Sequence, residues 1–378
     1  MTRTVPPFRA DHVGSLLRPP EVLRAREQHA AGELSADDLR AVEDAAIADA
    51  VRLQESVGLR SATDGEFRRQ SWHMDFIFQL GGIGRRPPSG QAVAFHTADG
   101  RTITSAQGSL FVDGKVALEH TIFGDDFLAL QSMVTTATPK LTIPSLNMIY
   151  ARGGRESIDE SVYPDLEEFW DDVKAAYVAE IQALHALGCT YLQLDDTSLA
   201  VLNDPAQRDA LARRGDDAEH LHLLFISRLN EVLAHKPAGM TVTTHMCRGN
   251  YRSAWAAEGS YDFVGEALFS ELNVDGFFVE YDDERSGGFE PLRFVPKGKM
   301  VVLGLVTTKT GDLESSDDLK RRIEQAAQYV DIDQLCLSPQ CGFASTLEGN
   351  DLSQEEQAAK LRLVVDTAAA VWGDAGVV

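Results

Sequence analysis

The sequence contains no segment that approaches the roughly 20 uninterrupted apolar residues of a membrane span. Its N-terminus, Met1-Thr-Arg-Thr-Val-Pro-Pro-Phe, has no apolar core of the kind found in signal peptides. Basic residues are also scarce, because 35 Lys and Arg stand against 58 Asp and Glu and give a formal net charge of −23. Such a charge repels phosphate backbones and anionic lipid. We therefore expect a cytoplasmic protein with neither nucleic acid nor membrane as a partner.

Cysteine is rare as well. Four cysteines in 378 residues make a poor disulfide framework and fit a reducing compartment. Cys189 and Cys336 lie in apolar stretches and are expected to be buried packing residues. The sequence also lacks internal repeats, low-complexity tracts and a Gly-rich phosphate loop between a strand and a helix. We therefore expect the cysteines to bind a metal or to pack in the core.

Short apolar, β-branched runs alternate with longer segments of 3.6-residue periodicity, which is typical of a parallel sheet covered by helices. The predicted strands are Phe8–Ser15, Leu59–Asp64, Lys140–Met148, Thr190–Asp196, Met240–His245, Gly276–Tyr281, Met300–Val306 and Gln334–Ser338. Predicted helices include Ala36–Ser56 with Ser35 as its N-cap, Asp165–Leu187, Asp217–His235, Ser316–Val330 and Ser353–Trp372. Strands that alternate with helices in this way predict an α/β fold, namely a (β/α)8 TIM barrel whose active site lies at the carboxyl ends of the strands.

The region from about Gln91 to His120 interrupts this alternation after the second strand. It contains two Asp-Gly pairs, at Asp99 and Asp113, between alternating β-branched stretches. Asp-Gly is a preferred turn of antiparallel hairpins. We interpret the region as a β-hairpin insertion that decorates a single domain over residues 1–378.

Zinc-type ligands follow three of the predicted strands. His245 and Cys247 form a His-x-Cys pair after the fifth strand, Glu280 ends the sixth, and Cys341 follows the eighth. Zinc takes cysteine sulfur and histidine nitrogen in tetrahedral sites, and an exchangeable position marks a catalytic centre. A buried cysteine beside a satisfied core histidine would explain the His-x-Cys pair alone. Because ligands from separate strands converge on one end of a barrel, we favour a zinc site that binds and activates a thiol.

Polar residues also collect at the ends of other strands. Gly14 and Ser15 follow the first, Glu66 the second, and Asp195 the fourth. Carboxylates there are costly to bury unless they meet a cation or a donor. One reading is that Glu66 pairs with Arg68 or Arg69, and that Asp195 or Asp196 caps the next helix. The other is that the two carboxylates and the Gly14–Ser15 amides bind a small zwitterion.

Six motifs, taken in order, resemble the catalytic C-terminal half of cobalamin-independent methionine synthase and, more closely, the stand-alone members of that family. They are His12-Val-Gly-Ser-Leu-Leu-Arg18-Pro, Asp64-Gly-Glu-Phe, Leu192-Gln-Leu-Asp-Asp, His245-Met-Cys, Val279-Glu280 and Ser338-Pro-Gln-Cys-Gly. The resemblance implies transfer of a methyl group to the thiol of homocysteine, with zinc as cofactor. It implies His245, Cys247, Glu280 and Cys341 as metal ligands, and Gly14, Ser15, Glu66 and Asp195 as the substrate-binding residues. We accordingly assign catalytic roles to Glu280, as the exchangeable ligand, and to Asp195.

The chain departs from the long methionine synthases in two ways. It has no room for their second, N-terminal barrel, and Gly304-Leu-Val-Thr-Thr-Lys309 stands where they carry an Asp-x-His-Ser-Pro-Arg stretch. The missing His could have protonated a departing folate nitrogen. We therefore expect a methyl-corrinoid or corrinoid protein as donor, with Thr307 and Thr308 in contact with it.

Two further interpretations remain open. The first is an alkyltransferase of the epoxyalkane:coenzyme M transferase type, which Glu66 and Asp195 disfavour because they would repel a sulfonate. The second is a non-catalytic protein that binds zinc or a thiol.

Overall fold

The computed structural model describes residues 3–86, 93–105 and 109–373. Its strands are β1 Ser61–Ala62, β2 Gly81–Arg86, β3 Val93–His96, β4 Thr102–Ser105, β5 Ser109–Ala117, β6 Thr138–Pro139, β7 Leu141–Pro144, β8 Tyr191–Asp196, β9 Thr241–Met246, β10 Asn250–Tyr251, β11 Ala254–Trp255, β12 Gly276–Glu280, β13 Met300–Val306 and β14 Leu335–Pro339. Its α-helices are α1 Pro20–Ala30, α2 Ala36–Ser56, α3 Met74–Ile77, α4 Gly124–Met133, α5 Asn147–Gly153, α6 Leu166–Ala186, α7 Ser198–Val201, α8 Pro205–Arg214, α9 Leu221–Leu233, α10 Gly265–Glu271, α11 Ser316–Ala326 and α12 Gln354–Trp372. Its 3-10 helices are η1 Gly154–Ser157, η2 Glu284–Ser286, η3 Glu290–Phe294 and η4 Ile332–Gln334.

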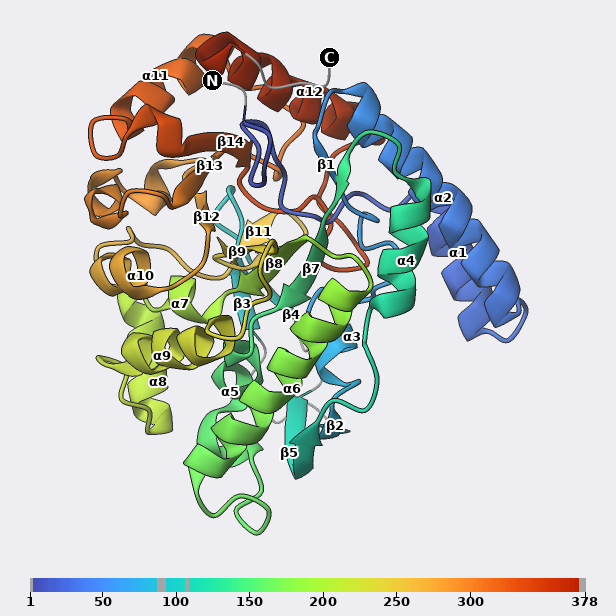
Figure 1. Ribbon diagram of the computed structural model, residues 1–378, viewed down its shortest axis with the longest axis vertical. Coiled ribbons are helices and arrows are strands. Elements are labelled where there is room, and N and C mark those ends of the chain that lie inside the picture. The colour runs from blue at the N-terminus through green and yellow to red at the C-terminus, as the bar shows by residue number, and fades with distance from the viewer. Residues whose placement is uncertain (1–2, 87–92, 106–108, 374–378) are drawn as a thin grey trace.

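The centre of the molecule is a six-stranded parallel sheet with the order β7-β8-β9-β12-β13-β14. Every residue of β8, β12 and β13 is buried, as expected for parallel strands that are covered on both faces. Helices surround these strands (Figure 1). The α/β prediction is therefore confirmed, and the carboxyl ends of the six strands point to one side.

Two shorter segments extend the parallel arrangement at its margins. The strand β1 pairs in parallel with β6, which directly precedes β7. At the other margin, Ala10 forms a parallel bridge with Leu337 of β14. The two segments also contact each other, since the Leu16 N–H donates to Gly65 O at 3.0 Å.

The predicted first strand is wrong in extent, because within Phe8–Ser15 only Ala10 forms a ladder bridge. Side chains occupy the backbone groups that a ladder would need. The carbonyl oxygens of Val13 and Gly14 accept hydrogen bonds from the Gln193 amide and the Thr63 hydroxyl. The third predicted strand is also too long, since it ends at Pro144 and its last residues belong to helix α5.

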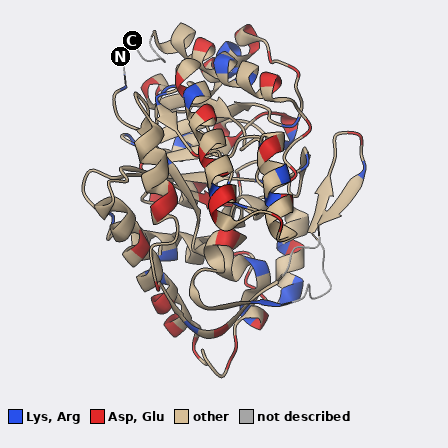
Figure 2. Ribbon diagram, turned by 90° about the vertical axis from the view of Figure 1, so that its right-hand side faces the viewer, with Lys and Arg blue, Asp and Glu red and all other residues tan. Residues whose placement is uncertain are grey.

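The predicted helices are found with shifts of a few residues at their ends. The helix α2 starts where predicted, and the Ser35 side chain accepts from the Asp38 N–H. The helix α12 begins with a capping box between Ser353 and Glu356. Among the described residues, no helix is both long and apolar enough to cross a membrane. Acidic and basic residues alternate over the helices on the face shown in Figure 2.

Antiparallel pairs lie between β1 and β6. The strand β3 pairs with β4, and the Asp99-Gly100 turn between them is found as predicted. The second Asp-Gly pair is not a turn, because Asp113 and Gly114 lie inside β5, which pairs with β2. Gly114 passes Gly82 so closely that a Cβ on Gly82 would overlap the Gly114 carbonyl, and the ladder register shifts there. The predicted start at Gln91 lies outside the described residues.

Candidate active site

Four residues with metal-binding side chains meet at the carboxyl ends of three strands. His245 lies at the end of β9 and Cys247 follows it, Glu280 ends β12, and Cys341 follows β14. One candidate ligand atom from each lies within 4.8 Å of the others, and all four residues are buried. Strands of one parallel sheet thus bring together residues that are far apart in the sequence.

The donor set fits a zinc ion. The Sγ atoms of Cys247 and Cys341 lie 3.4 Å apart, whereas zinc–sulfur bonds of about 2.3 Å in a tetrahedron place two sulfurs about 3.8 Å apart. Both ring nitrogens of His245 are buried and have no hydrogen-bond partner among the described residues. The hydrogen bond from Cys247 and the charge of the nearby His245 hold the pKa of the Cys341 thiol well below its usual range. A buried thiol with a lowered pKa, beside an imidazole that has no hydrogen-bond partner, is a favourable site for a soft divalent cation.

A second layer of residues positions Glu280. Its Oε1 accepts from the Arg248 N–H at 3.0 Å, and its backbone carbonyl accepts from Arg248 Nη1 at 2.9 Å. Its own N–H donates to the Tyr261 hydroxyl at 3.0 Å. Arg248 is among the largest fully buried side chains of the molecule. Sequence reasoning did not identify it, although it directly follows Cys247.

The expected substrate-binding residues lie next to this cluster. Asp195 is the register partner of His245 in the adjoining strand. A Cβ on Gly14 would come within 3.3 Å of Glu66 Oε1, and one on Gly342 would overlap Ser15 Oγ. Since Gly342 follows Cys341, Ser15 lies beside the loop that carries this cysteine. The structure therefore brings together the residues that were singled out as a zwitterion site.

The two carboxylates are in unusual surroundings. Glu66 Oε1 accepts from the Thr142 hydroxyl at 2.8 Å, while Oε2 is buried without a partner among the described residues. Burial raises the pKa of Glu66, and burial together with nearby Glu66 raises the pKa of Asp195 to about 7. Such groups gain from an incoming cation. The expected ion pair of Glu66 is present only in part, since Arg69 Nη1 lies 3.6 Å from Glu66 Oε1.

Arg68 and Asp196 bind partners outside the zwitterion site. Arg68 pairs with Asp44 and Asp126 rather than with Glu66. Asp196, not Asp195, caps the next helix, since its Oδ1 accepts from the Leu199 N–H at 3.1 Å. Neither residue therefore binds the carboxylates of Glu66 and Asp195, which form the acidic pair of the site.

Glu66 is held in a strained backbone conformation with φ of 60°. Two buried groups stabilise it. Arg18 Nη2 donates to the Glu66 carbonyl at 2.8 Å, and the Glu66 N–H donates to Asp64 Oδ1 at 2.9 Å. Arg18 also donates to the carbonyls of Ala344 and Thr346, so one guanidinium joins the Glu66 loop to the segment after Cys341. The sequence motif contains Arg18, but its spacing alone gives no indication of this role.

Thr307 and Thr308, which are expected to contact the methyl donor, make hydrogen bonds within the protein. The Thr308 hydroxyl lies 2.9 Å from Gln340 Oε1 and 3.2 Å from Gly342 O, so its one O–H can donate to either acceptor in the loop of Cys341. Thr307 is half-buried, and its N–H donates to Glu314. Lys309 is buried, and its Nζ lies 3.1 Å from Asp282 Oδ2. A cation thus occupies the segment in which the His of the long synthases is missing.

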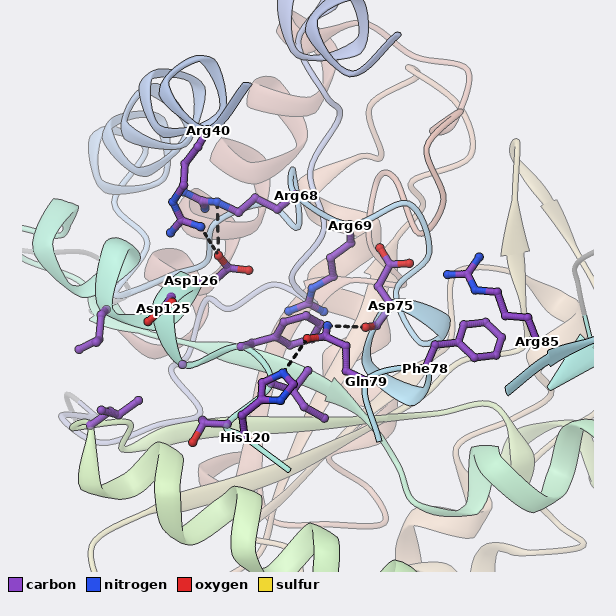
Figure 3. Close-up of a pocket in the computed structure, with 16 residues that line it drawn as sticks. Arg40, Arg68, Arg69, Asp75, Phe78, Gln79, Arg85, His120, Asp125 and Asp126 are labelled. Carbon is purple, nitrogen blue, oxygen red and sulfur yellow. Dashed lines mark hydrogen bonds and ion pairs between the residues drawn. The ribbon is translucent and has the colours of Figure 1, made fainter. Parts of the chain in front are cut away.

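Figure 3 shows a pocket of about 900 Å³. It is lined by Arg40, Arg68, Arg85, His120 and Asp126 among others, and by none of the proposed ligands or substrate-binding residues. Arg69 lies between this pocket and the substrate site, because it lines the pocket and its guanidinium also reaches Thr142 and Glu66.

Comparisons with known proteins identify the family of this chain. Residues 8–370 match the family model described as "Cobalamin-independent synthase, Catalytic domain". The uncharacterized protein YxjH of Bacillus subtilis is 48% identical over 368 residues, which cover 97% of this chain and 95% of YxjH. A methionine synthase of Pyrococcus abyssi is 26% identical over 339 residues, 88% of this chain and 85% of that protein. A Listeria monocytogenes structure, provisionally named a vitamin-B12-independent methionine synthase, has a TM-score of 0.78 and 38% identity, and the match covers 98% of this chain and 100% of that one. The protein belongs to the cobalamin-independent synthase catalytic-domain family, the family of the methionine synthases that methylate homocysteine without cobalamin.

Proposed function

We propose that the protein is a zinc-dependent methyltransferase that transfers a methyl group to the thiol of homocysteine and gives methionine. The observation that carries the proposal is the position of the four-residue cluster, His245, Cys247, Glu280 and Cys341, beside the acidic pair. The cluster suits a thiol-binding metal, and Glu66 Oε2 offers an unpaired buried acceptor to an ammonium group. An amino acid that carries a thiol satisfies both.

Each part of the substrate has residues to receive it. Zinc, when bound, would supply the charge that keeps a substrate thiol deprotonated near neutral pH. Glu66 and Asp195 would bind the ammonium group, and the backbone near Gly14 and Ser15 would bind the carboxylate. Glu66 is fixed by Arg18, and the Cys341 loop by Thr308, so the two ends of the substrate are oriented against each other.

We also infer that the parallel segments close into a (β/α)8 barrel. The bridge of Ala10 to β14 and the hydrogen bond of Leu16 to Gly65 support closure, because they link the two margins of the parallel arrangement. Residues 1–378 then form one domain. The antiparallel pairs β2–β5 and β3–β4 form an insertion in it, which begins before the expected residue 91.

The comparisons do not support a corrinoid donor, since the family is described as cobalamin-independent. We propose methyltetrahydrofolate as the donor instead. A corrinoid donor is favoured only if no proton donor replaces the missing His. Lys309 carries an ammonium group in this segment, and its charge helps to keep the pKa of Cys341 low and opposes the rise that burial causes in the pKa of Glu280.

The test is product formation by the zinc-loaded protein. Homocysteine is offered with methyltetrahydrofolate or with methylcobalamin, and methionine is measured by mass spectrometry. We expect methionine from methyltetrahydrofolate, with at least about tenfold lower turnover from methylcobalamin at equal concentration. Higher turnover with methylcobalamin would restore the corrinoid donor. Absence of methionine with both donors, in a protein that binds zinc at the cluster, would refute the proposed function. A third incubation, of 2-mercaptoethanesulfonate with a short epoxide, tests for an alkyltransferase of the epoxyalkane type.

A further inference from the structure

A charged side chain that belongs to neither the ligand set nor the substrate site lies beside Glu280. Arg285 follows β12 in the short helix η2, and its side chain is only 6% exposed. Its Nη2 lies 3.8 Å from Glu280 Oε2 and 2.9 Å from Asp282 Oδ1. The first distance is too long for a hydrogen bond. Arg285 therefore attracts the Glu280 carboxylate without yet binding it.

Other contacts hold the guanidinium in this place. It packs over the Trp255 ring with its Cζ 4.6 Å from the ring centre, and its Nη1 lies 2.8 Å from Asp283 Oδ2. Nonetheless, Nε and Nη1 are buried without a hydrogen bond of adequate geometry to any described residue. Lys309 also pairs with Asp282, so Arg285 is not the only cation that this carboxylate binds. The guanidinium thus has unused capacity for an acceptor.

Glu280 is able to move only at its carboxylate. Its backbone is bonded on both sides, to the Tyr261 hydroxyl and to Arg248 Nη1. Its Oε1 accepts from the Arg248 N–H, whereas no hydrogen bond to Oε2 is found within the described part of the chain. Rotation of the carboxylate about its own bonds therefore moves Oε2 toward or away from Arg285.

We propose that Arg285 receives the Glu280 carboxylate when the sulfur of a substrate thiol replaces it in the ligand set. The inference rests on the proposed function. Oε2 has to approach Nη2 by about 1 Å to form a charge-assisted hydrogen bond. A thiolate replaces a carboxylate, so the charge of the ligand set is unchanged and the thiol proton passes to solvent. Arg285 is a positioning residue, because it acts through Glu280 and does not touch the substrate.

Loss of Arg285 should weaken thiol binding and leave metal binding unchanged. Without Arg285, the released carboxylate is a buried charge that has lost its ion pair, and exchange becomes less favourable. Without substrate, Glu280 keeps its place in the ligand set, and the metal affinity does not fall. A residue that merely supported the local fold would weaken metal and thiol binding together.

The experiment uses the full chain loaded with Co²⁺, whose visible absorption responds to ligand exchange. Homocysteine is titrated into the wild type and into Arg285→Gln, and Co²⁺ affinity is measured separately by chelator competition. We expect the homocysteine Kd of Arg285→Gln to rise about tenfold, with the Co²⁺ affinity unchanged within about threefold. Arg285→Lys keeps the positive charge and should raise the Kd by less than about threefold. It also provides a second measurement if Arg285→Gln does not fold. Arg293→Gln, an exposed arginine in η3 of the same connection, is the matched control and should change neither quantity.

A double variant separates this role from others. In Glu280→Gln no charged carboxylate is released, so adding Arg285→Gln should no longer change the homocysteine Kd. An unchanged Kd in Arg285→Gln, or a parallel loss of Co²⁺ and homocysteine affinity, would overturn the proposal for Arg285 alone. A wild-type spectrum that does not respond to homocysteine would instead refute the proposed function, and this inference with it.

Discussion

Replacing Cys341 by serine separates a metal ligand from a packing cysteine more sharply than any other change. Its Sγ lies 3.4 Å from that of Cys247, and both residues are buried. Cys336, in strand β14 only a few residues earlier, is equally buried but packs with Val13 and Phe278 in a separate apolar cluster. Cys336→Ser is therefore a matched control, because the chemical change is the same and only the surroundings differ.

The size of the effect follows from the number of ligands. Zinc binding by four protein ligands is worth about 10–16 kcal/mol, so one ligand accounts for roughly 3 kcal/mol. We expect the wild type to bind about one zinc per chain and Cys341→Ser to bind it about 100-fold more weakly. Cys336→Ser should keep the wild-type zinc affinity, while its buried hydroxyl lowers the free energy of unfolding by about 1–3 kcal/mol.

Chelator competition measures the zinc Kd of the three proteins, and urea unfolding of the metal-free proteins measures their stability. Cys341→Ser should lose zinc affinity, whereas Cys336→Ser should keep it and lose free energy of unfolding. A wild-type zinc Kd in Cys341→Ser would refute the assignment of this residue as a ligand. Equal losses of zinc affinity in the two variants would show that packing, and not ligation, explains the effect.

Three further results are expected. Glu66→Gln should weaken the binding of homocysteine about tenfold more than the binding of the deamino analogue 4-mercaptobutyrate, because only the amino acid carries an ammonium group. Equal losses of affinity for the two thiols would contradict an amino-acid substrate. Burial raises the pKa of Glu180 from 4.5 to about 7, although it accepts from the Ile122 N–H. Its contribution to stability is therefore complete below about pH 4.5 and is lost as the pH rises through about 7, which at 1.36 kcal/mol per pH unit amounts to about 3 kcal/mol. Urea unfolding at pH 5 and pH 8 should show a smaller pH dependence in Glu180→Gln, and an undiminished one would contradict this. Gly342→Ala should displace Ser15 and raise the homocysteine KM at least about tenfold, with zinc content as the control; an unchanged KM would exclude Ser15 from the substrate site.

The sequence predicted that His245, Cys247, Glu280 and Cys341 would lie together, because this prediction depends only on strand order. In a parallel sheet, a residue just beyond a strand lies at the same edge as the residues that end the other strands. His245, Glu280 and Cys341 could therefore be placed together without knowledge of any side-chain contact. The α/β alternation was predicted for the same reason, since burial on both faces leaves strands such as β13 apolar throughout.

Strand extents were less predictable where side chains replace ladder hydrogen bonds. The segment Phe8–Ser15 has the composition of a strand, yet Gln193 and Thr63 from other parts of the chain bind its carbonyls. The same happens in the second predicted strand, where the Gln54 side chain bonds both the N–H and the carbonyl of Thr63. Hydrophobic periodicity contains no information about such distant partners. The Asp113-Gly114 error has a related cause, because a glycine required for close passage of Gly82 was interpreted as a turn glycine.

The buried arginines around the four-residue cluster were the least predictable part of the candidate site. Arg18, Arg248 and Arg285 are all arginines whose guanidinium groups bind backbone carbonyls or carboxylates inside the protein. By composition, each would be placed on the surface, where most arginines lie. Several backbone carbonyls converging on one guanidinium offset the cost of burying its charge. Such convergence requires loops that are distant in sequence to end at one point, as the loops after β1 and β14 do at Arg18. The four-residue cluster can therefore be inferred from the strand ends, whereas the arginines that bind the Glu66 carbonyl or lie beside Glu280 become recognisable only when the loops are placed in three dimensions.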